Sequence, residues 1–247
     1  MQNLMNLDEL PPQVKERFVP YLRELIELHG DKIICVSIYG SAAGRNYIHK
    51  VSDINSVVVF QDLDFSIFKK SLKVVSRGLK SKITPPLFLT KKYIESSWDV
   101  FPIEFLDMKE NHVLIYGEDI LTTLEINSRD LRLFCEQELK GKLIRIRQAY
   151  LEIGLNKRHI KTILRESLDS LMPVFRNLIR LKNKKPHVDK EKILYELAEE
   201  FHLNVDVFIP IYHDKAHKKK IAHTDTEALL EKYIAELQRL SFLVDEL

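Results

Sequence analysis

The sequence predicts an α+β protein in which a small mixed β-sheet domain is followed by an α-helical bundle. Up to about residue 124, short apolar runs rich in β-branched residues alternate with helical patterns. After that point almost every apolar residue recurs at helical spacing. The 247 residues are 45% apolar and 30% charged, which suits two domains that each bury a core. We therefore expect one domain over residues 1–124 and a second over residues 125–247.

The first domain should combine strands with helices packed on them. Residues 32–39, KIICVSIY, are rich in β-branched residues and lie between two glycines, so they predict a buried strand. Further strands are expected over residues 54–60, 87–90 and 101–108, and helices over residues 12–28, 41–47, 64–80 and 91–97. In the helix over residues 64–80, the apolar side is predicted to consist of Phe68, Leu72, Val75 and Leu79.

The second domain is predicted to be almost wholly helical. One apolar stripe runs from Leu131 to Ile153 for roughly six turns, which predicts a single long helix. A second helix is expected over residues 160–181, with a kink at Pro173, and a shorter one over residues 190–201. The last should cover residues 224–247 and open with a capping box between Thr224 and Glu227.

Charge and apolar content limit which ligands and which cellular location we expect for the protein. The formal net charge of +2 is too small to indicate a nucleic-acid-binding protein by itself. No apolar run approaches the roughly 18 residues that span a bilayer, and the N-terminal residues do not follow the plan of a signal peptide. We therefore expect a cytoplasmic protein without a membrane partner. Cys35 and Cys135 lie in apolar runs and are predicted to be packing residues.

The residues most suggestive of chemistry follow the first predicted strand. Gly40-Ser41 comes directly after it, and Asp53-Ile54-Asn55 follows a spacer of eleven residues, 42–52. Glycine lets the backbone approach phosphate oxygens, and a serine hydroxyl can bind them. Two acids at alternate positions of a strand point to the same side and can hold a pair of Mg²⁺ ions between them. Here the second acid is replaced by Asn55.

This pattern resembles the signature of the DNA polymerase β-like nucleotidyltransferase superfamily. The resemblance implies that Gly40 and Ser41 bind the nucleotide and that Asp53 and Asn55 hold Mg²⁺ or Mn²⁺. In that family a third acid comes from a neighbouring strand, and the best candidate here is Glu104 in FPIEFLDM, with Asp107 as its rival. Asp53 and Glu104 would then be the catalytic carboxylates.

Residues 114–119, LIYGED, and the helical C-terminal half are also similar to those of kanamycin-type nucleotidyltransferases. The resemblance implies transfer of a nucleoside monophosphate from an NTP to an acceptor hydroxyl on a small molecule, a protein or an RNA. The alternative is a catalytically inactive protein that keeps this fold and uses its helical half to form a homo-oligomer or to hold a partner. Asn55 favours this alternative, because an amide oxygen brings no negative charge to a metal.

Two basic stretches provide further candidates. Residues 66–94 contain lysines and arginines but no acid, and Lys69, Lys73, Arg77 and Lys80 share a helix face that could bind nucleic-acid phosphates. We favour a solvated face, because Phe68 belongs to the predicted apolar side and is poorly placed to stack on bases. In HDKAHKKKIAH, His213 and His217 have a spacing suited to one metal ion, but the adjacent lysines favour contact with an anion or with solvent.

Overall fold

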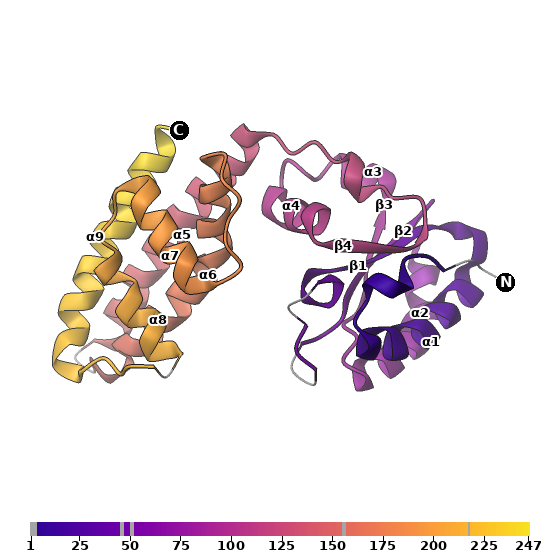
Figure 1. Ribbon diagram of the computed structural model, residues 1–247, viewed down its shortest axis with the longest axis horizontal. Coiled ribbons are helices and arrows are strands. Elements are labelled where there is room, and N and C mark those ends of the chain that lie inside the picture. The colour runs from indigo at the N-terminus through magenta and orange to yellow at the C-terminus, as the bar shows by residue number, and fades with distance from the viewer. Residues whose placement is uncertain (1–3, 45–46, 50–51, 155–156, 217) are drawn as a thin grey trace. The chain divides into compact units, whose positions relative to one another are not determined.

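The computed structural model describes residues 4–44, 47–49, 52–154, 157–216 and 218–247 (Figure 1). The chain divides into two compact units, Met1–Ile126 and Asn127–Leu247. The division lies two residues after the predicted boundary between residues 124 and 125. Each unit has its own buried apolar residues, and each is described below by itself.

The first unit is built on a four-stranded mixed sheet with the strand order β3-β2-β1-β4. Strand β1 pairs antiparallel with both β2 and β4, while β2 pairs parallel with β3. The elements in chain order are α1 (Pro12–His29), β1 (Ile33–Tyr39), β2 (Asn55–Phe60), α2 (Phe65–Lys80), β3 (Leu87–Thr90), α3 (Lys91–Glu95), α4 (Pro102–Glu110) and β4 (His112–Gly117).

Helices cover both faces of this sheet. Figure 1 shows α1 and α2 on one face and α3 and α4 on the other. Each face of the sheet has its own apolar core, and β2 contributes side chains to both because successive residues point to opposite faces. Val58 and Phe60 pack toward α1 and α2, while Val57 and Val59 pack on the opposite side with Cys35. Cys35 is a buried free thiol, as the sequence predicted.

The predicted strand over residues 101–108 is wrong. These residues belong to α4, which begins at Pro102 and buries Ile103, Phe105 and Met108. Apolar residues at 101, 103 and 105 alternate as in a strand, but proline is favoured in the first turn of a helix, and Met108 extends the buried set at helical spacing. The fourth strand is instead β4, which pairs with β1 and was not predicted.

The predicted apolar side of α2 is also wrong. The residues that face the core are Ile67, Ser71, Val74 and Gly78. The Ser71 hydroxyl lies 2.8 Å from Nε2 of His29 in α1, and a Cβ at Gly78 would come within 2.7 Å of the Tyr21 ring. Small residues therefore form the close contact with α1, a signal that counting apolar residues overlooks.

The second unit is a bundle of helices. Its α-helices are α5 (Ser128–Ile153), α6 (Ile160–Leu181), α7 (Lys190–Phe201), α8 (Ile209–Lys215) and α9 (Thr226–Asp245). Helix α5 packs against α6 and α9, and α6 also packs against α7 and α8. The sequence predicted all of these but the short α8. None of the helices in the described ranges is both long and apolar enough to cross a membrane.

The predicted capping box at the start of the last helix is wrong as well. Helix α9 begins at Thr226, with Asp225 rather than Thr224 in the flanking position. The Glu227 carboxylate instead accepts a hydrogen bond of 2.6 Å from the Tyr150 hydroxyl and another from Lys157. Glu227 therefore forms contacts with residues outside α9 instead of a hydrogen bond at the start of its own helix.

An ion pair between a buried carboxylate and a partly exposed arginine holds the connection between α8 and α9. Asp214 is 1% exposed and accepts hydrogen bonds from Arg165 Nε at 2.6 Å and from the Ile221 N–H at 3.0 Å. Burial by itself raises the pKa of Asp214, but the two hydrogen bonds and the charge of Arg165 outweigh it, so the pKa lies below its usual value of 3.8.

Gly117 should be nearly irreplaceable in the first unit. It has φ +81°, and a Cβ there would lie 1.8 Å from the Ile34 carbonyl oxygen. We expect Gly117→Ala to lower the free energy of unfolding by roughly 3 kcal/mol or more, from backbone strain plus the clash. Gly154→Ala is the control, because Gly154 has φ +54° but no atom within 4 Å of the added Cβ, and strain alone should cost about 1–2 kcal/mol. Urea unfolding of both variants measures the difference, and equal losses would contradict the clash.

Asp214→Ala should destabilise the helical unit by about 2–3 kcal/mol, because it leaves Arg165 and the Ile221 N–H without their acceptor. Since the pKa of Asp214 is lowered by folding, its contribution is complete above pH 4 and is lost as the pH falls through the folded-state value. Urea unfolding at a series of pH values should therefore show wild type and variant converging in acid. A constant difference down to the lowest pH would contradict this account.

Candidate functional site

The turn after β1 provides the first part of the candidate site. Gly40 has φ +73°, a conformation that glycine adopts without strain, and its N–H donates to the Asn111 carbonyl oxygen at 3.0 Å. Residues Gly40–Ala43 form a short 3₁₀ turn, with Ala42 buried beneath it and Ser41 half-buried. The helix predicted over residues 41–47 is thus reduced to one turn in its described part, and residues 45 and 46 lie outside the described ranges.

Asp53 and Asn55 lie at the start of β2, next to this turn. Asn55 pairs with Tyr39 in the antiparallel register, and Tyr39 is the residue before Gly40. Ile54 between them is fully buried, so alternation directs Asp53 and Asn55 to the opposite side. Asp53 is exposed and Asn55 is half-buried. The structure therefore brings Gly40 and Asn55 together, as the sequence pattern predicted.

The side-chain amide of Asn55 lies between Thr84 and the Gly40 turn. The Thr84 hydroxyl lies 2.8 Å from Asn55 Oδ1 and 3.1 Å from the Ile54 carbonyl oxygen, so its one proton can be donated to either, and the Thr84 N–H donates to the Ile54 carbonyl oxygen at 3.0 Å. The other end of the amide points to the turn, because a Cβ added at Gly40 would lie 3.7 Å from Asn55 Nδ2. A hydrogen-bond donor thus faces the place where phosphate is expected. Sequence reasoning missed Thr84, which follows an apolar residue in an otherwise unremarked loop.

Tyr39 lies beside these groups. Burial raises the pKa of its hydroxyl, so the group stays protonated at neutral pH. Tyr39 is also paired with His112 on the far side of β1. His112 is held in place, because its ring nitrogens lie 3.0 Å from the Asp119 carboxylate and 3.1 Å from the Lys109 carbonyl oxygen.

Glu104 was expected on a strand beside β2, and the structure does not place it on a strand. It is exposed in the first turn of α4, a helix rather than a strand beside β2. The end of α4 that approaches Gly40 is the last turn, next to Asn111, and a rise of 1.5 Å per residue puts Glu104 about 10 Å away along the axis. Asp107 lies half-buried in the same helix. A role for either acid as the third metal ligand stays a prediction.

Strand β3, which lies beside β2, contains no acid that could take the place of Glu104. In β3, Leu89 packs on the same side of the sheet as Val57 and Val59, so alternation puts Leu87 on that side too. Leu87 pairs with Val57, two residues along from Asn55, and is 39% exposed. Leu87 therefore lies on the same side of the sheet as Asn55, but four residues along the register from Asp53. None of the four strands contains Asp or Glu.

This donor set does not fit a pair of divalent cations. Two metal ions need several negative ligands, and here the sequence pattern supplies Asp53, just before β2, and the neutral Asn55. Asn55 Oδ1 is also engaged by Thr84. In the described part of the chain no three His, Cys, Asp or Glu side chains converge as a metal site.

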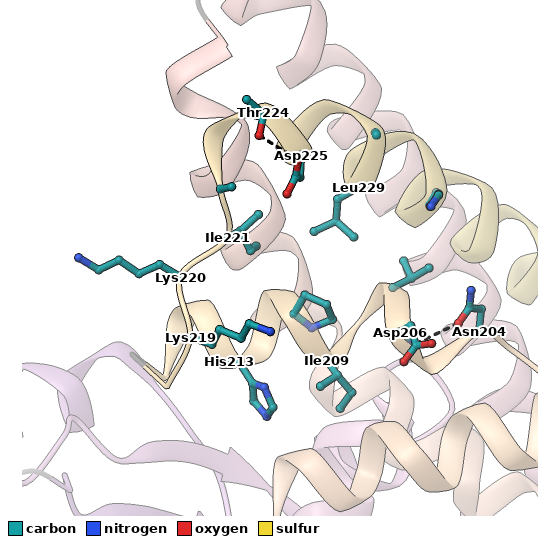
Figure 2. Close-up of a pocket in the computed structure, with 15 residues that line it drawn as sticks. Asn204, Asp206, Ile209, His213, Lys219, Lys220, Ile221, Thr224, Asp225 and Leu229 are labelled. Carbon is teal, nitrogen blue, oxygen red and sulfur yellow. Dashed lines mark hydrogen bonds between the residues drawn. The ribbon is translucent and has the colours of Figure 1, made fainter.

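The histidine-rich stretch of the second unit borders a cavity of about 760 Å³ (Figure 2). Ile209, Ile221 and Leu229 provide apolar walls, and Lys219 and Asp206 are among the charged residues around them. His213 is held by Glu191, whose Oε1 lies 2.9 Å from its Nε2. His217, the other predicted ligand, lies outside the described residues.

No protein-family model and no curated protein sequence matches the chain. Among solved structures, the chain is similar to spectinomycin adenyltransferase AAD(9) from Enterococcus faecialis, crystallised with ATP and spectinomycin. The TM-score is 0.54 at 12% sequence identity, and the match covers 90% of this chain and 98% of that chain. A likeness at this identity shows the fold. The predicted α+β class is confirmed, and the chain shares its overall fold with AAD(9), an adenyltransferase.

Proposed function

We propose that this protein binds a nucleoside triphosphate at the turn formed by Gly40 and Ser41 and does not transfer its nucleotidyl group. The observation that carries the proposal is the uncharged amide of Asn55 beside Gly40, with Oδ1 2.8 Å from the Thr84 hydroxyl and Nδ2 on the side of the turn. A carboxylate at this place would repel phosphate unless a metal ion lay between them. An amide nitrogen instead donates to a phosphate oxygen directly.

The neighbouring groups support the same ligand. Gly40 presents no side chain toward the turn, and the Ser41 hydroxyl and the protonated Tyr39 hydroxyl are further donors from the same end of β1. AAD(9), which shares the fold, was crystallised with ATP. A cytoplasmic protein, as the sequence predicts, would meet nucleoside triphosphates in that compartment.

The loss of strand carboxylates is the reason to exclude transfer from the proposal. In nucleotidyl transfer a metal pair aligns the triphosphate and stabilises the charge that develops at the α-phosphorus. Each charged ligand whose loss weakens that stabilisation by roughly 3 kcal/mol slows the reaction on the order of 100-fold. Asn55 in place of one such ligand would then slow it on the order of 100-fold.

A second candidate function is a slow transferase that uses one Mg²⁺ or Mn²⁺ ion. It is favoured by Asp53, which is exposed beside the turn and can bind a metal ion together with the phosphates of the substrate. The similarity to AAD(9) extends through the helical unit, where an acceptor could be held. The acceptor would be a small molecule, a protein or an RNA. Spectinomycin is the compound present in the AAD(9) structure and is one compound to try.

The amide of Asn55 should favour nucleotide binding in the absence of metal. We expect Asn55→Asp to weaken ATP binding in EDTA at least tenfold, about 1.4 kcal/mol, because a carboxylate then faces the triphosphate. Isothermal titration of the full chain with each common NTP measures this. Asn183→Asp is the control, because it makes the same charge change at an exposed residue of the second unit. Equal affinity of Asn55→Asp and wild type would contradict phosphate contact at this amide.

Placing carboxylates on β2 and β3 should make ATP binding depend on Mg²⁺. We expect Mg²⁺ to raise the ATP affinity of wild type less than threefold and that of Asn55→Asp/Leu87→Glu at least tenfold, since the variant supplies acids on β2 and β3. Leu87 is partly exposed, so the substitution should be tolerated. Titrations with and without Mg²⁺ measure the ratio. If wild type shows strong Mg²⁺ dependence that Asp53→Ala removes, the slow-transferase candidate replaces the binding protein.

A further inference from the structure

Helix α2 has a second apolar face that the first unit does not bury. Beside the buried row of Ile67, Ser71, Val74 and Gly78 runs a row of apolar side chains that stand out from the protein. Their exposed fractions are 72% for Phe65, 40% for Phe68, 65% for Leu72 and 54% for Leu79. Isolated exposed apolar residues need no explanation, but a continuous row along a helix is typical of an interaction surface. We call these four residues the outer row.

Cations border the outer row along one side. Lys69, Lys73 and Lys80 project roughly 40–80° further round the helix than Phe65, at 100° per residue. Lys69 Nζ lies 5.4 Å from the centre of the Phe65 ring. Within the described residues, none of these three lysines forms an ion pair, whereas Arg77 on the same helix pairs with Glu24. The sequence from 66 to 94 contains no Asp or Glu to neutralise them.

The outer row is held rigidly in place by its own helix and by the sheet. Asp64 caps the start of α2 by accepting from the Ser66 and Ile67 N–H groups at 2.7 and 3.2 Å. The Phe68 ring lies 5.8 Å from the Phe88 ring of β3, which in turn packs 5.0 Å from Phe60 in the core. The surface is therefore preformed, and binding need not order it.

Charge and shape together select the ligand. A helix face bordered by three lysines without ion pairs suits a uniformly negative surface, such as phospholipid headgroups or nucleic acid, better than a protein with interspersed charges of both signs. Nucleic acid provides no apolar layer for the aliphatic side chains of Leu72 and Leu79, and neither residue stacks on a base as an aromatic ring does. An anionic lipid surface provides both, because apolar side chains enter the acyl boundary while lysines reach the headgroups.

We propose that the outer row of α2 and its lysines bind the surface of an anionic phospholipid membrane, with α2 lying parallel to the lipid plane. Binding of this kind needs no membrane-spanning segment. It uses residues on the α1-facing layer of the sheet and is independent of the proposed nucleotide site, whose residues lie at the start of β2 rather than after its end.

Sedimentation with lipid vesicles tests this proposal on the full chain. We expect wild type to sediment with phosphatidylcholine vesicles that contain phosphatidylglycerol, to remain in solution with phosphatidylcholine alone, and to bind less as salt is raised. Leu72→Ser/Leu79→Ser and Lys69→Glu/Lys73→Glu should each lower binding to the anionic vesicles at least tenfold. All four positions are exposed, so both variants should fold, which circular dichroism verifies.

Two matched controls should bind as wild type does. Leu133→Ser/Ile144→Ser removes two exposed aliphatic residues from α5, which are 44% and 57% exposed. Lys185→Glu/Lys220→Glu makes the same change in net charge at exposed lysines of the second unit. Loss of binding in either control would overturn the assignment to α2.

Other outcomes also overturn the proposal. No binding to anionic vesicles, equal binding to neutral ones, or full binding by Leu72→Ser/Leu79→Ser would each do so. A single-stranded RNA oligonucleotide serves as the rival probe: RNA binding that needs the lysines but not the leucines, without vesicle binding, would assign the surface to nucleic acid. A wild-type dimer that Leu72→Ser/Leu79→Ser converts to a monomer, again without vesicle binding, would assign it to a second copy of the chain.

Discussion

The antiparallel pairing of β1 with β2 is the constraint on which the candidate site depends. Its register sets Asn55 against Tyr39, and the chain reverses into the Gly40 turn at the next residue. The turn is then fixed by backbone groups alone, through the Gly40 N–H and the Asn111 carbonyl oxygen. Any residue at position 55 would therefore face the same turn, and its chemistry decides what the turn can bind.

Replacing a carboxylate by an amide at this position removes one negative charge from the surroundings of the turn. In a nucleotidyltransferase the carboxylates attract metal ions, and the metal ions attract phosphate. In this chain Asn55 offers a donor to the turn and an acceptor to Thr84, so phosphate can be bound without an intermediary.

Much of the fold could be predicted from local patterns. The β-branched runs predicted β1, β2 and β3, and the long apolar stripe predicted α5, because burial on one or both faces leaves a clear periodicity. The start of β2 and the Gly40 turn were recognisable for the same reason: glycine, serine and aspartate at fixed places around strands report a defined backbone path.

The errors arose where tertiary contacts outweigh local pattern. Residues 102–110 were predicted in part as a strand but form a helix that begins at proline. Glu104 therefore lies on a helix and not on the strand where the third acid was expected. Thr84 reaches Asn55 from a loop that carries no sequence signal. Glu227 serves Tyr150 and Lys157 instead of its own helix start. The last two depend on residues distant in sequence, which periodicity cannot register, whereas Pro102 is a local signal that outweighs alternation.

The packing of α2 through small residues has a consequence for how this chain tolerates substitution. Where a helix contacts its neighbour through Ser71 and Gly78, folding demands small side chains at those two positions and rejects bulk. At Phe65, Leu72 and Leu79, in contrast, folding makes almost no demand, and random mutation would replace apolar residues there with polar ones. Among descendants selected for stability alone, residues on the inner side of α2 would stay the same while those of the outer row changed. Apolar residues kept in the outer row would therefore indicate selection for contact with another surface.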